Sequence, residues 1–385
     1  MKNISSENPV FQEIKGRLGF GCMRLPLLGD GQVDFAEFSS MVDYFLDSGF
    51  NYFDTAHGYL EGKSETALRE CLVKRHRRED YILVNKLTSG FFKKREDIRP
   101  FFESQLQACG VDYFDIYLMH SQQRGIYSKY KECGAYEEAF RLKAEGKVRC
   151  VGISFHDNAA LLEQILTDYP EIEVVQIQFN YADYEDPSVQ SREVYEVCRR
   201  HGKPVIVMEP VKGGNLARLP ERAEQVVREL GRGSAASLAI RFAAGFEGIF
   251  MTLSGMGSMD MMRDNVGFMK DFRPLDEKEL SAIEEIKAIL KSKSLIDCTA
   301  CRYCVDGCPA GIKIPDLFSC ANNKKIFEGD WNPAYYYGVH TAKGGKASDC
   351  IGCAACEGVC PQHLPIRALL AEVAETFESG DGEED

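Results

Sequence analysis

The stretch YILVNKLTSGFFKKREDIRPFFESQLQACGVDYFDIYLMH, residues 81–120, shows the pattern that decides the fold. It begins and ends with a short run rich in Val, Ile, Leu, Tyr and Phe, Tyr81–Leu87 and Tyr113–His120, as buried parallel strands do. Short apolar runs alternate with amphipathic stretches from about Gly16 to Lys270. The other strand candidates are Leu18–Met23, Asn51–Asp54, Cys150–Ser154, Val174–Phe179, Pro204–Met208 and Ile249–Ser254.

Helix candidates lie between these strands. In Asp34–Asp47 the apolar residues from Phe38 to Leu46 are spaced 3, 1, 3 and 1 apart, which places them on one face of a helix. The other candidates in this part of the chain are Glu65–Val73, Tyr136–Glu145, Asn158–Thr167, Val189–His201, Ser234–Ala243 and Met259–Lys270.

Eight strands, each followed by a helix, within about 250 residues predict an α/β protein with a (β/α)8 TIM barrel. The alternative is an open doubly wound sheet, which favours a GxGxxG fingerprint after the first strand. The two glycine-rich stretches, GFGCMR at 19–24 and GMGSMD at 255–260, do not match it. The barrel is therefore the preferred prediction.

The composition changes to Cys, Gly, Pro and Lys after a further expected helix, Leu275–Ser292. We therefore expect a barrel domain over residues 1–292, a small cysteine-rich domain over 293–375, and an acidic tail over 376–385.

The overall composition is typical of a soluble globular protein, with 44% hydrophobic and 27% charged residues. A net charge of −13 disfavours a nucleic-acid partner, because phosphates repel such a surface. The sequence shows neither a long apolar span nor a signal-type N-terminus. We expect a cytoplasmic protein that does not engage a membrane.

Fifteen cysteines are many for a reducing compartment, and this number favours metal binding over disulfides. Eight of them form two copies of the run C-x2-C-x2-C-x3-C-P, which is the bacterial ferredoxin pattern for [4Fe–4S] clusters. The copies are Cys298, Cys301, Cys304 and Cys308, then Cys350, Cys353, Cys356 and Cys360. Zinc is the weaker alternative, because it needs four ligands per site and no crossing cysteine.

In such runs three cysteines hold one cluster and the fourth crosses to the other. One cluster would take Cys298, Cys301, Cys304 and Cys360, and the other Cys350, Cys353, Cys356 and Cys308. The intervening Ile314–Phe327 is expected to be helical, which resembles the α-helical ferredoxin type. Cys320 fits neither run. The remaining thiols are interpreted as inert with respect to metal: Cys22, Cys71, Cys109, Cys133, Cys150 and Cys198.

Polar side chains follow three consecutive strands of the predicted barrel. The second strand is followed by Asp54 and Tyr59, the third carries Lys86, and the fourth ends with His120. Barrel active sites lie at the C-terminal ends of the strands, so these four groups are expected to share one cavity. Each residue alone would more often be structural.

With these motifs, DTAHGY, NKL, LMH, GISFHD and the eight-cysteine pattern, the chain resembles the aldo-keto reductase family, in the branch with a C-terminal ferredoxin-like domain. The resemblance covers about 17–270 and 297–373. It implies that Tyr59 donates a proton to a carbonyl oxygen, that Lys86 lowers the pKa of Tyr59, that Asp54 holds Lys86, and that His120 orients the carbonyl.

The resemblance also implies NAD(P)H bound in the barrel mouth. Ser154 and Gln176 match residues that hold the carboxamide, although Phe155 stands where the family has Asn. Met208 replaces an aromatic group stacked on the ring, or is simply a core residue. The full set implied around the cofactor is Cys22, Met23, Ser154, Gln176, Met208, Ser254, Gly255, Asp264 and Asn265.

The nucleotide preference and the substrate stay open in the sequence. NADP-specific members carry Lys and Arg where this chain has Gly255 and Met261, although Arg263 is near, so either NADH or NADPH fits. The loop after the fourth strand, expected over Ser121–Ala135, would help to shape the substrate pocket.

Three functions remain in consideration. The first is NAD(P)H-dependent reduction of a small-molecule carbonyl, or the reverse alcohol oxidation, with two [4Fe–4S] clusters attached. The second is a single-electron reductase linked to ferredoxin, another electron carrier or a flavin, because clusters move one electron and nicotinamides move two. The third is a redox sensor or structural module without turnover.

Overall fold

The computed structural model describes residues 8–186, 189–292, 295–296, 298, 302–326, 332–342, 344–360 and 364–379. Within them the chain divides by contacts into two compact units. Unit 1 comprises Met1–Ala217 and Gly233–Glu279, and unit 2 comprises Arg218–Arg232 and Leu280–Asp385. The domain bounds expected from composition, 1–292, 293–375 and 376–385, stay a prediction.

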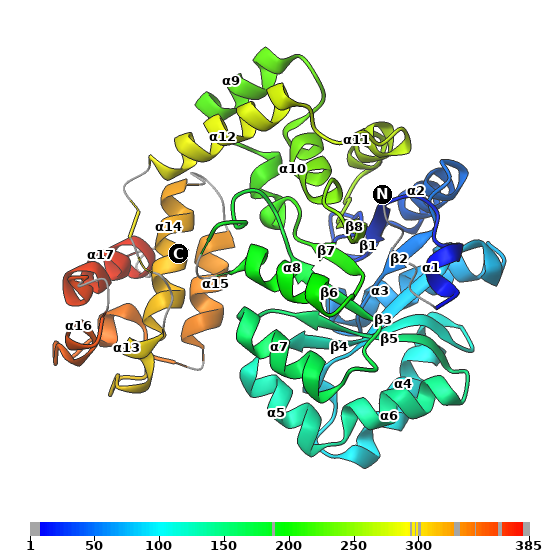
Figure 1. Ribbon diagram of the computed structural model, residues 1–385, viewed down its shortest axis with the longest axis horizontal. Helices are drawn as coiled ribbons and strands as arrows, with labels where there is room; N and C mark the ends of the chain where they lie inside the picture. The colour runs from blue at the N-terminus through cyan, green and yellow to red at the C-terminus, as the bar shows by residue number, and fades with distance from the viewer. Residues whose placement is uncertain are drawn as a thin grey trace. The chain divides into compact units, whose positions relative to one another are not determined.

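Unit 1 contains a closed parallel barrel whose strands follow one another in the order of the sequence (Figure 1). The (β/α)8 prediction is therefore confirmed. The strands are β1 Leu18–Gly21, β2 Tyr52–Asp54, β3 Ile82–Leu87, β4 Phe114–Gln122, β5 Val148–Phe155, β6 Val174–Gln178, β7 Val205–Met208 and β8 Ile249–Ser254.

Helices surround the strands of unit 1. The first long helix begins where the side chain of Asp34 accepts hydrogen bonds from the backbone N–H groups of Ala36 and Glu37. The α-helices are α1 Val10–Glu13, α2 Phe35–Asp47, α3 Lys63–Leu68, α4 Arg95–Cys109, α5 Arg124–Glu132, α6 Ala135–Ala144, α7 Ala159–Asp168, α8 Ser191–Arg200, α10 Ala235–Ala244 and α11 Met259–Lys270. Short turns of other helix types are η1 Tyr59–Gly62, η2 Arg69–Val73, η3 Arg78–Asp80, η4 Ser89–Phe91 and η5 Lys212–Ala217.

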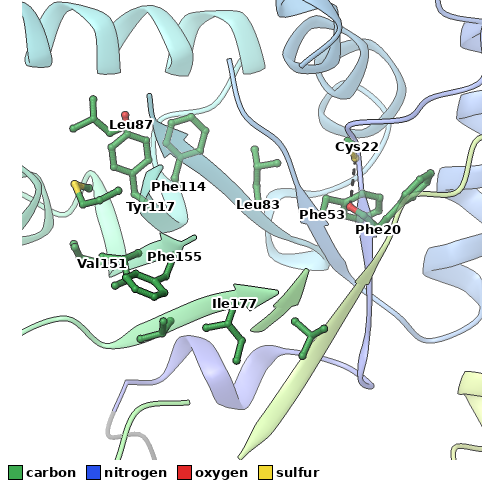
Figure 2. Close-up of a cluster of buried hydrophobic side chains, with 14 of the residues drawn as sticks. Phe20, Cys22, Phe53, Leu83, Leu87, Phe114, Tyr117, Val151, Phe155 and Ile177 are labelled. Atoms are coloured by element: carbon green, nitrogen blue, oxygen red, sulfur yellow. Dashed lines mark hydrogen bonds between the residues drawn. The ribbon is translucent and has the colours of Figure 1, made fainter. Parts of the chain in front are cut away.

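Side chains alternate along each strand between the inside of the barrel and the helix layer. Figure 2 shows part of the outer cluster, with Phe53, Leu83, Tyr117 and Ile177 labelled. On the same four strands, Tyr52, Val84, Leu118 and Val174 belong to the inner cluster, which Val10 of α1 also joins. Because side chains alternate, the residues two positions further along each strand point inward as well, at the C-terminal end of the barrel. These residues are Asp54, Lys86, His120 and Gln176.

The segment expected as a loop over Ser121–Ala135 is instead the end of β4 followed by α5, so this expectation is wrong. The physical reason is burial: Tyr127 and Tyr130, one turn apart, both point into the outer core. The Tyr130 hydroxyl donates to the carbonyl oxygen of Leu87, which ties this helix to β3.

Unit 2 is helical in its described residues, and it includes the segment with the cysteine repeat. Its elements are α9 Glu221–Leu230, most of α12 Glu277–Lys291, α13 Tyr303–Asp306, α14 Ile314–Ile326, α15 Asn332–Thr341, η6 Ala347–Asp349, α16 Ala355–Gly358 and α17 Ile366–Glu378. The helix expected over 314–327 is thus present to Ile326, and residue 327 lies outside the described residues. A search of the described part of the chain finds no helix with the length and apolar character of a membrane span.

Candidate active site and cysteine segment

Lys86 is the centre of the polar group at the barrel mouth. Its Nζ donates to Asp54 Oδ1 at 2.6 Å, to the Thr55 carbonyl oxygen at 2.9 Å and to the Tyr59 hydroxyl at 3.2 Å. The second carboxylate oxygen of Asp54 accepts a hydrogen bond from Gln176 Nε2 at 3.3 Å. The structure therefore brings Asp54, Tyr59, Lys86 and Gln176 into one connected network.

The ion pair between Lys86 and Asp54 is almost completely enclosed, with side-chain exposures of 1% and 4%. Burial acts to lower the pKa of Lys86, but the carboxylate of Asp54 and the phenol of Tyr59 outweigh it, and the pKa is raised. Lys86 is thus positively charged beside the tyrosine hydroxyl.

The acidity of Tyr59 differs from the expectation. Burial raises the pKa of Tyr59 above its usual value, and the ammonium of Lys86 only partly opposes this effect. Lys86 thus acts in the expected direction, but the net pKa of Tyr59 is raised, because removing a phenolate from water costs more than one buried ion pair returns. Tyr59 is therefore protonated at neutral pH.

His120 lies on the same side of the mouth. Its ring centroid is 6.1 Å from that of Tyr59, and its Nδ1 lies 2.8 Å from the Thr88 hydroxyl. Burial, followed by the charge of Lys86, lowers the pKa of His120 well below its usual value. The imidazole is consequently neutral and carries one N–H donor and one acceptor nitrogen.

The end of β4 is irregular next to His120. Met119 pairs with Ile153 on β5, but the next pair joins Gln122 to Phe155, so β4 holds one residue more than its neighbour. Ser121 takes the left-handed φ of +54° within this bulge. Such bulges change the direction of side chains near active sites, and here the bulge follows His120 directly.

A second polar network lies behind Lys86, and the sequence reasoning missed it. Asn85 accepts from the backbone N–H of Lys86, and Gln105 donates to the Lys86 carbonyl oxygen at 3.0 Å. The completely buried Glu65 accepts from Asn85 at 2.8 Å and lies 2.7 Å from His57 Nδ1. Glu65 and Gln105 are polar residues on the buried faces of α3 and α4. A polar residue among the apolar positions of a helix is the signal that could have indicated a buried network.

The residues expected around a nicotinamide lie on neighbouring strands. Ser154 is buried on β5, one residue before the strand ends, and its Oγ lies 3.3 Å from His156 Nε2. Met208 ends β7 and pairs in register with Gln178 on β6. Sequence reasoning did not assign a role to His156, although the motif GISFHD contains it.

The residues expected near the adenosine end form a separate group. The Ser254 hydroxyl accepts from Asn265 of α11 at 2.7 Å, whereas Asp264 is exposed and accepts from the Ser234 hydroxyl. A Cβ added at Gly255 would lie 3.7 Å from the Arg24 side chain, so the ends of β8 and β1 adjoin.

Two further candidates follow β1. Cys22 is buried, and its backbone N–H donates to the Asp54 carbonyl oxygen at 2.8 Å. Burial raises the pKa of its thiol well above the usual value. Met23 is 49% exposed. Of these two, Cys22 is therefore tied to the strand that carries Asp54.

The two cysteine copies fold alike where the structure describes both. Each cysteine of the second copy follows its counterpart by the same 52 residues. Arg302 and Ala354, which follow the second cysteine of each copy, both have left-handed φ values, +66° and +59°. Each begins a four-residue helix, α13 and α16, that carries the third cysteine.

The donor set suits iron–sulfur clusters. Cys304 belongs to the hydrophobic core of unit 2, and Cys298, Cys308, Cys350, Cys356 and Cys360 pack against it. Helices α13 and α16 contact each other, which brings the two copies together. Cys353 is exposed, and Cys301 lies outside the described residues. Within the described residues no group of three or more Cys, His, Asp or Glu side chains is gathered closely enough to hold a single metal ion.

Two family models match different parts of the chain. The model of the aldo/keto reductase family matches residues 17–288, and that of a 4Fe–4S dicluster domain matches residues 297–364. The chain belongs to the aldo/keto reductase family, a family of oxidoreductase enzymes, and the expected C-terminal cluster domain is confirmed. The cytoplasmic location stays a prediction.

Two curated relatives illustrate the similarity. The NADH-specific methylglyoxal reductase of Escherichia coli (strain K12) is 29% identical over 46% of this chain and 57% of its own length. The 9,11-endoperoxide prostaglandin H2 reductase of Trypanosoma cruzi (strain CL Brener) is 26% identical over 51% of this chain and 65% of its own length. The chain thus matches less than two thirds of the length of either relative.

Solved structures show the same barrel. An aldo-keto reductase from Bacillus halodurans in its holo form superposes with a TM-score of 0.56 and 26% identity, over 70% of this chain and 91% of that one. An aldo-keto reductase from Klebsiella pneumoniae in complex with NADPH gives 0.57 and 20% identity, over 70% and 90%. The second likeness is at the level of the fold alone.

Proposed function

We propose that the chain reduces a small-molecule carbonyl with NAD(P)H, or oxidises the corresponding alcohol, and that Tyr59 is the proton donor. The observation that carries the proposal is the buried chain of contacts from Asp54 through Lys86 to the Tyr59 hydroxyl, at 2.6 and 3.2 Å. The relatives include a methylglyoxal reductase, which supports carbonyl reduction.

Each residue of the group has a role that follows from its state. The nicotinamide, when bound, supplies a hydride to the carbonyl carbon. Tyr59 holds the proton that goes to the carbonyl oxygen, and the positive charge of Lys86 stabilises the phenolate that remains. Asp54 keeps Lys86 in place, and the neutral His120 orients the carbonyl oxygen through a hydrogen bond.

The residues proposed to hold the nicotinamide end are Ser154, Gln176 and Met208. Those proposed for the rest of the nucleotide are Cys22, Met23, Ser254, Gly255, Asp264 and Asn265. The similar proteins differ in nucleotide, since one is an NADH-specific reductase and one solved structure is a complex with NADPH, so both nucleotides are candidates for this chain.

We further propose two [4Fe–4S] clusters in the C-terminal domain, which would supply one-electron transfer. One would bind to Cys298, Cys301, Cys304 and Cys360, and the other to Cys350, Cys353, Cys356 and Cys308. The matching local geometry at Arg302 and Ala354 supports equivalent roles for the two runs. A single-electron reaction linked to ferredoxin or a flavin is the second candidate function, and the dicluster match favours it over a module without redox chemistry.

The test is a comparison of Tyr59→Phe with the wild type, both purified anaerobically and assayed with a panel of aldehydes and ketones. We expect kcat/KM to fall by about 10²–10⁴-fold, because only the proton donor is removed. Nucleotide Kd should stay within about twofold.

Tyr195→Phe is the matched control, because its hydroxyl bonds the Glu247 carbonyl oxygen on the outside of the barrel. Undiminished carbonyl reduction in Tyr59→Phe would reject the proposed donor. Turnover that requires reduced ferredoxin or added flavin, rather than NAD(P)H, would favour the second candidate.

A further inference from the structure

A second histidine lies at the barrel mouth, and the proposed reaction does not use it. His156 Nε2 lies 3.3 Å from the hydroxyl of the buried Ser154. Burial, followed by the charge of Lys86, lowers the pKa of His156 to about 4. The imidazole is therefore neutral at pH 7, with one nitrogen that donates and one that accepts.

The length of β5 determines where this histidine points. The strand continues to Phe155, which pairs with Gln122 on β4 and Ile177 on β6. The backbone N–H of His156 then donates to the Gln122 carbonyl oxygen at 2.9 Å. The strand and its neighbours thus hold the backbone of residues 154–156.

Alternation along the strand separates the three side chains. Phe155 is buried in the outer cluster, where Figure 2 draws it, and contributes nothing polar to the mouth. Ser154 and His156, two residues apart, face the same side and touch. The polar partner available to Ser154 is therefore His156 rather than the residue that follows it directly.

We propose that His156 is a positioning residue for Ser154 in a subsite for the carboxamide of the nicotinamide. The inference rests on the proposed function, since it assumes that a nicotinamide enters the mouth. A hydrogen bond with the imidazole fixes the rotation of the Ser154 hydroxyl. The hydrogen-bonding capacity of the hydroxyl that is left, a proton or a lone pair, then has a defined direction. A primary amide offers both a donor and an acceptor, and it can meet either arrangement.

This role differs from proton transfer. A base with so low a pKa takes up little proton at neutral pH. A residue that only orients Ser154 should affect ligands that carry the carboxamide and should spare ligands that lack it.

The experiment uses the full chain, purified anaerobically, and isothermal titration with two ligands. The first is oxidised NAD⁺ or NADP⁺, whichever the wild type binds, and the second is the matching ADP-ribose or its 2′-phosphate, which lacks nicotinamide. In His156→Leu we expect the complete nucleotide to bind about fivefold to tenfold more weakly, the effect of one lost hydrogen bond. ADP-ribose affinity should stay within about twofold, which also verifies that the variant is folded.

His156→Gln, which keeps a donor and an acceptor, should recover most of the lost affinity. His201→Leu is the matched control, because His201 pairs with Glu163 on the helix layer, and it should change neither affinity. Equal weakening for both ligands, or no weakening for either, would overturn the inference and leave the proposed function standing. A wild type that binds ADP-ribose and the nucleotide equally, or neither, would count against the proposed function itself.

Discussion

The barrel mouth and the cysteine segment bring their candidate functional side chains together in opposite ways. In the barrel, Asp54 and Lys86 are distant in sequence, and they meet because β2 and β3 pair in parallel, with Asp54 opposite Val84. In the cysteine segment each run is local: a left-handed residue, a short helix and closely spaced thiols recur after 52 residues.

This difference between a local run and residues from several strands explains why the cysteine segment is easier to recognise in the sequence than the barrel site. The spacing of the cysteines is itself the binding pattern, so it can be recognised without a fold. The spacing of Asp54, Tyr59, Lys86 and His120 has no meaning until the barrel places the strand ends together. A motif within one short run of sequence can therefore indicate a ligand class by itself, whereas residues from several strands can be grouped only after the topology is known.

The largest expected effect separates the two sites. Cys356→Ala should lower iron and sulfide from about eight to about four per chain, because one cubane loses a ligand. Binding of NAD(P)H should be retained, since none of the residues proposed to hold the nucleotide is a proposed cluster ligand. Iron analysis and nucleotide titration of the anaerobically purified protein measure both effects.

Cys320→Ala is the control for this change. Cys320 is a buried thiol in the same unit, outside both runs, and its replacement should leave the iron content unchanged. A full complement of iron in Cys356→Ala would show that Cys356 is not a cluster ligand, and an equal loss in both variants would show that the loss is not specific to the cysteine runs.

A change inside the barrel should affect stability without affecting the clusters. At Gly152 an added Cβ would lie 2.5 Å from the Val174 carbonyl oxygen and 2.7 Å from a Leu118 methyl group. Gly152→Ala should therefore reduce the free energy of unfolding of the barrel by about 1–3 kcal/mol, as overpacking does. Urea unfolding followed by near-ultraviolet circular dichroism measures it, and cluster absorbance should change at the wild-type midpoint.

Gly267→Ala is the matched control, because no atom lies within 4 Å of its added Cβ and the position is helical. It should be neutral or slightly stabilising, since alanine favours helices. Equal unfolding midpoints for the two variants would contradict the tight interior packing that the strand register implies.

The smallest expected effect tests the group behind His120. Thr88→Val removes the hydroxyl that lies 2.8 Å from His120 Nδ1, and the imidazole loses a partner that fixes its orientation. We expect kcat/KM to fall by about fivefold to tenfold with nucleotide Kd unchanged. Thr88→Ser keeps the hydroxyl and should retain most of the activity; if both variants behave alike, the hydroxyl is not what orients His120.

Much of the barrel could be predicted from the sequence, because buried parallel strands are short and rich in branched and aromatic residues. The bounds were less accurate where pairing, not composition, extends a strand: β5 reaches Phe155 through bonds to its neighbours, beyond the expected end at Ser154. Helix α4 was not among the expected helices, since Pro100 and a charged start interrupt its apolar pattern.

The sequence allowed the grouping of the candidate residues to be predicted, but not the net pKa of Tyr59. The grouping of Asp54, Lys86 and Tyr59 follows from the strand ends, but the net pKa of Tyr59 depends on burial, which side chains from other strands create. Thr88, Gln105 and His156 were missed because each contacts the candidate site through a neighbour whose position only the fold defines. Residue type alone gave no reason to select them.

The division of the chain into units has a consequence for cutting the chain between them. Residues 218–232, with α9, belong by contact to unit 2 although unit 1 resumes at Gly233. A single proteolytic cut near 280–292 would therefore release a C-terminal fragment and leave a piece of its unit within the barrel chain.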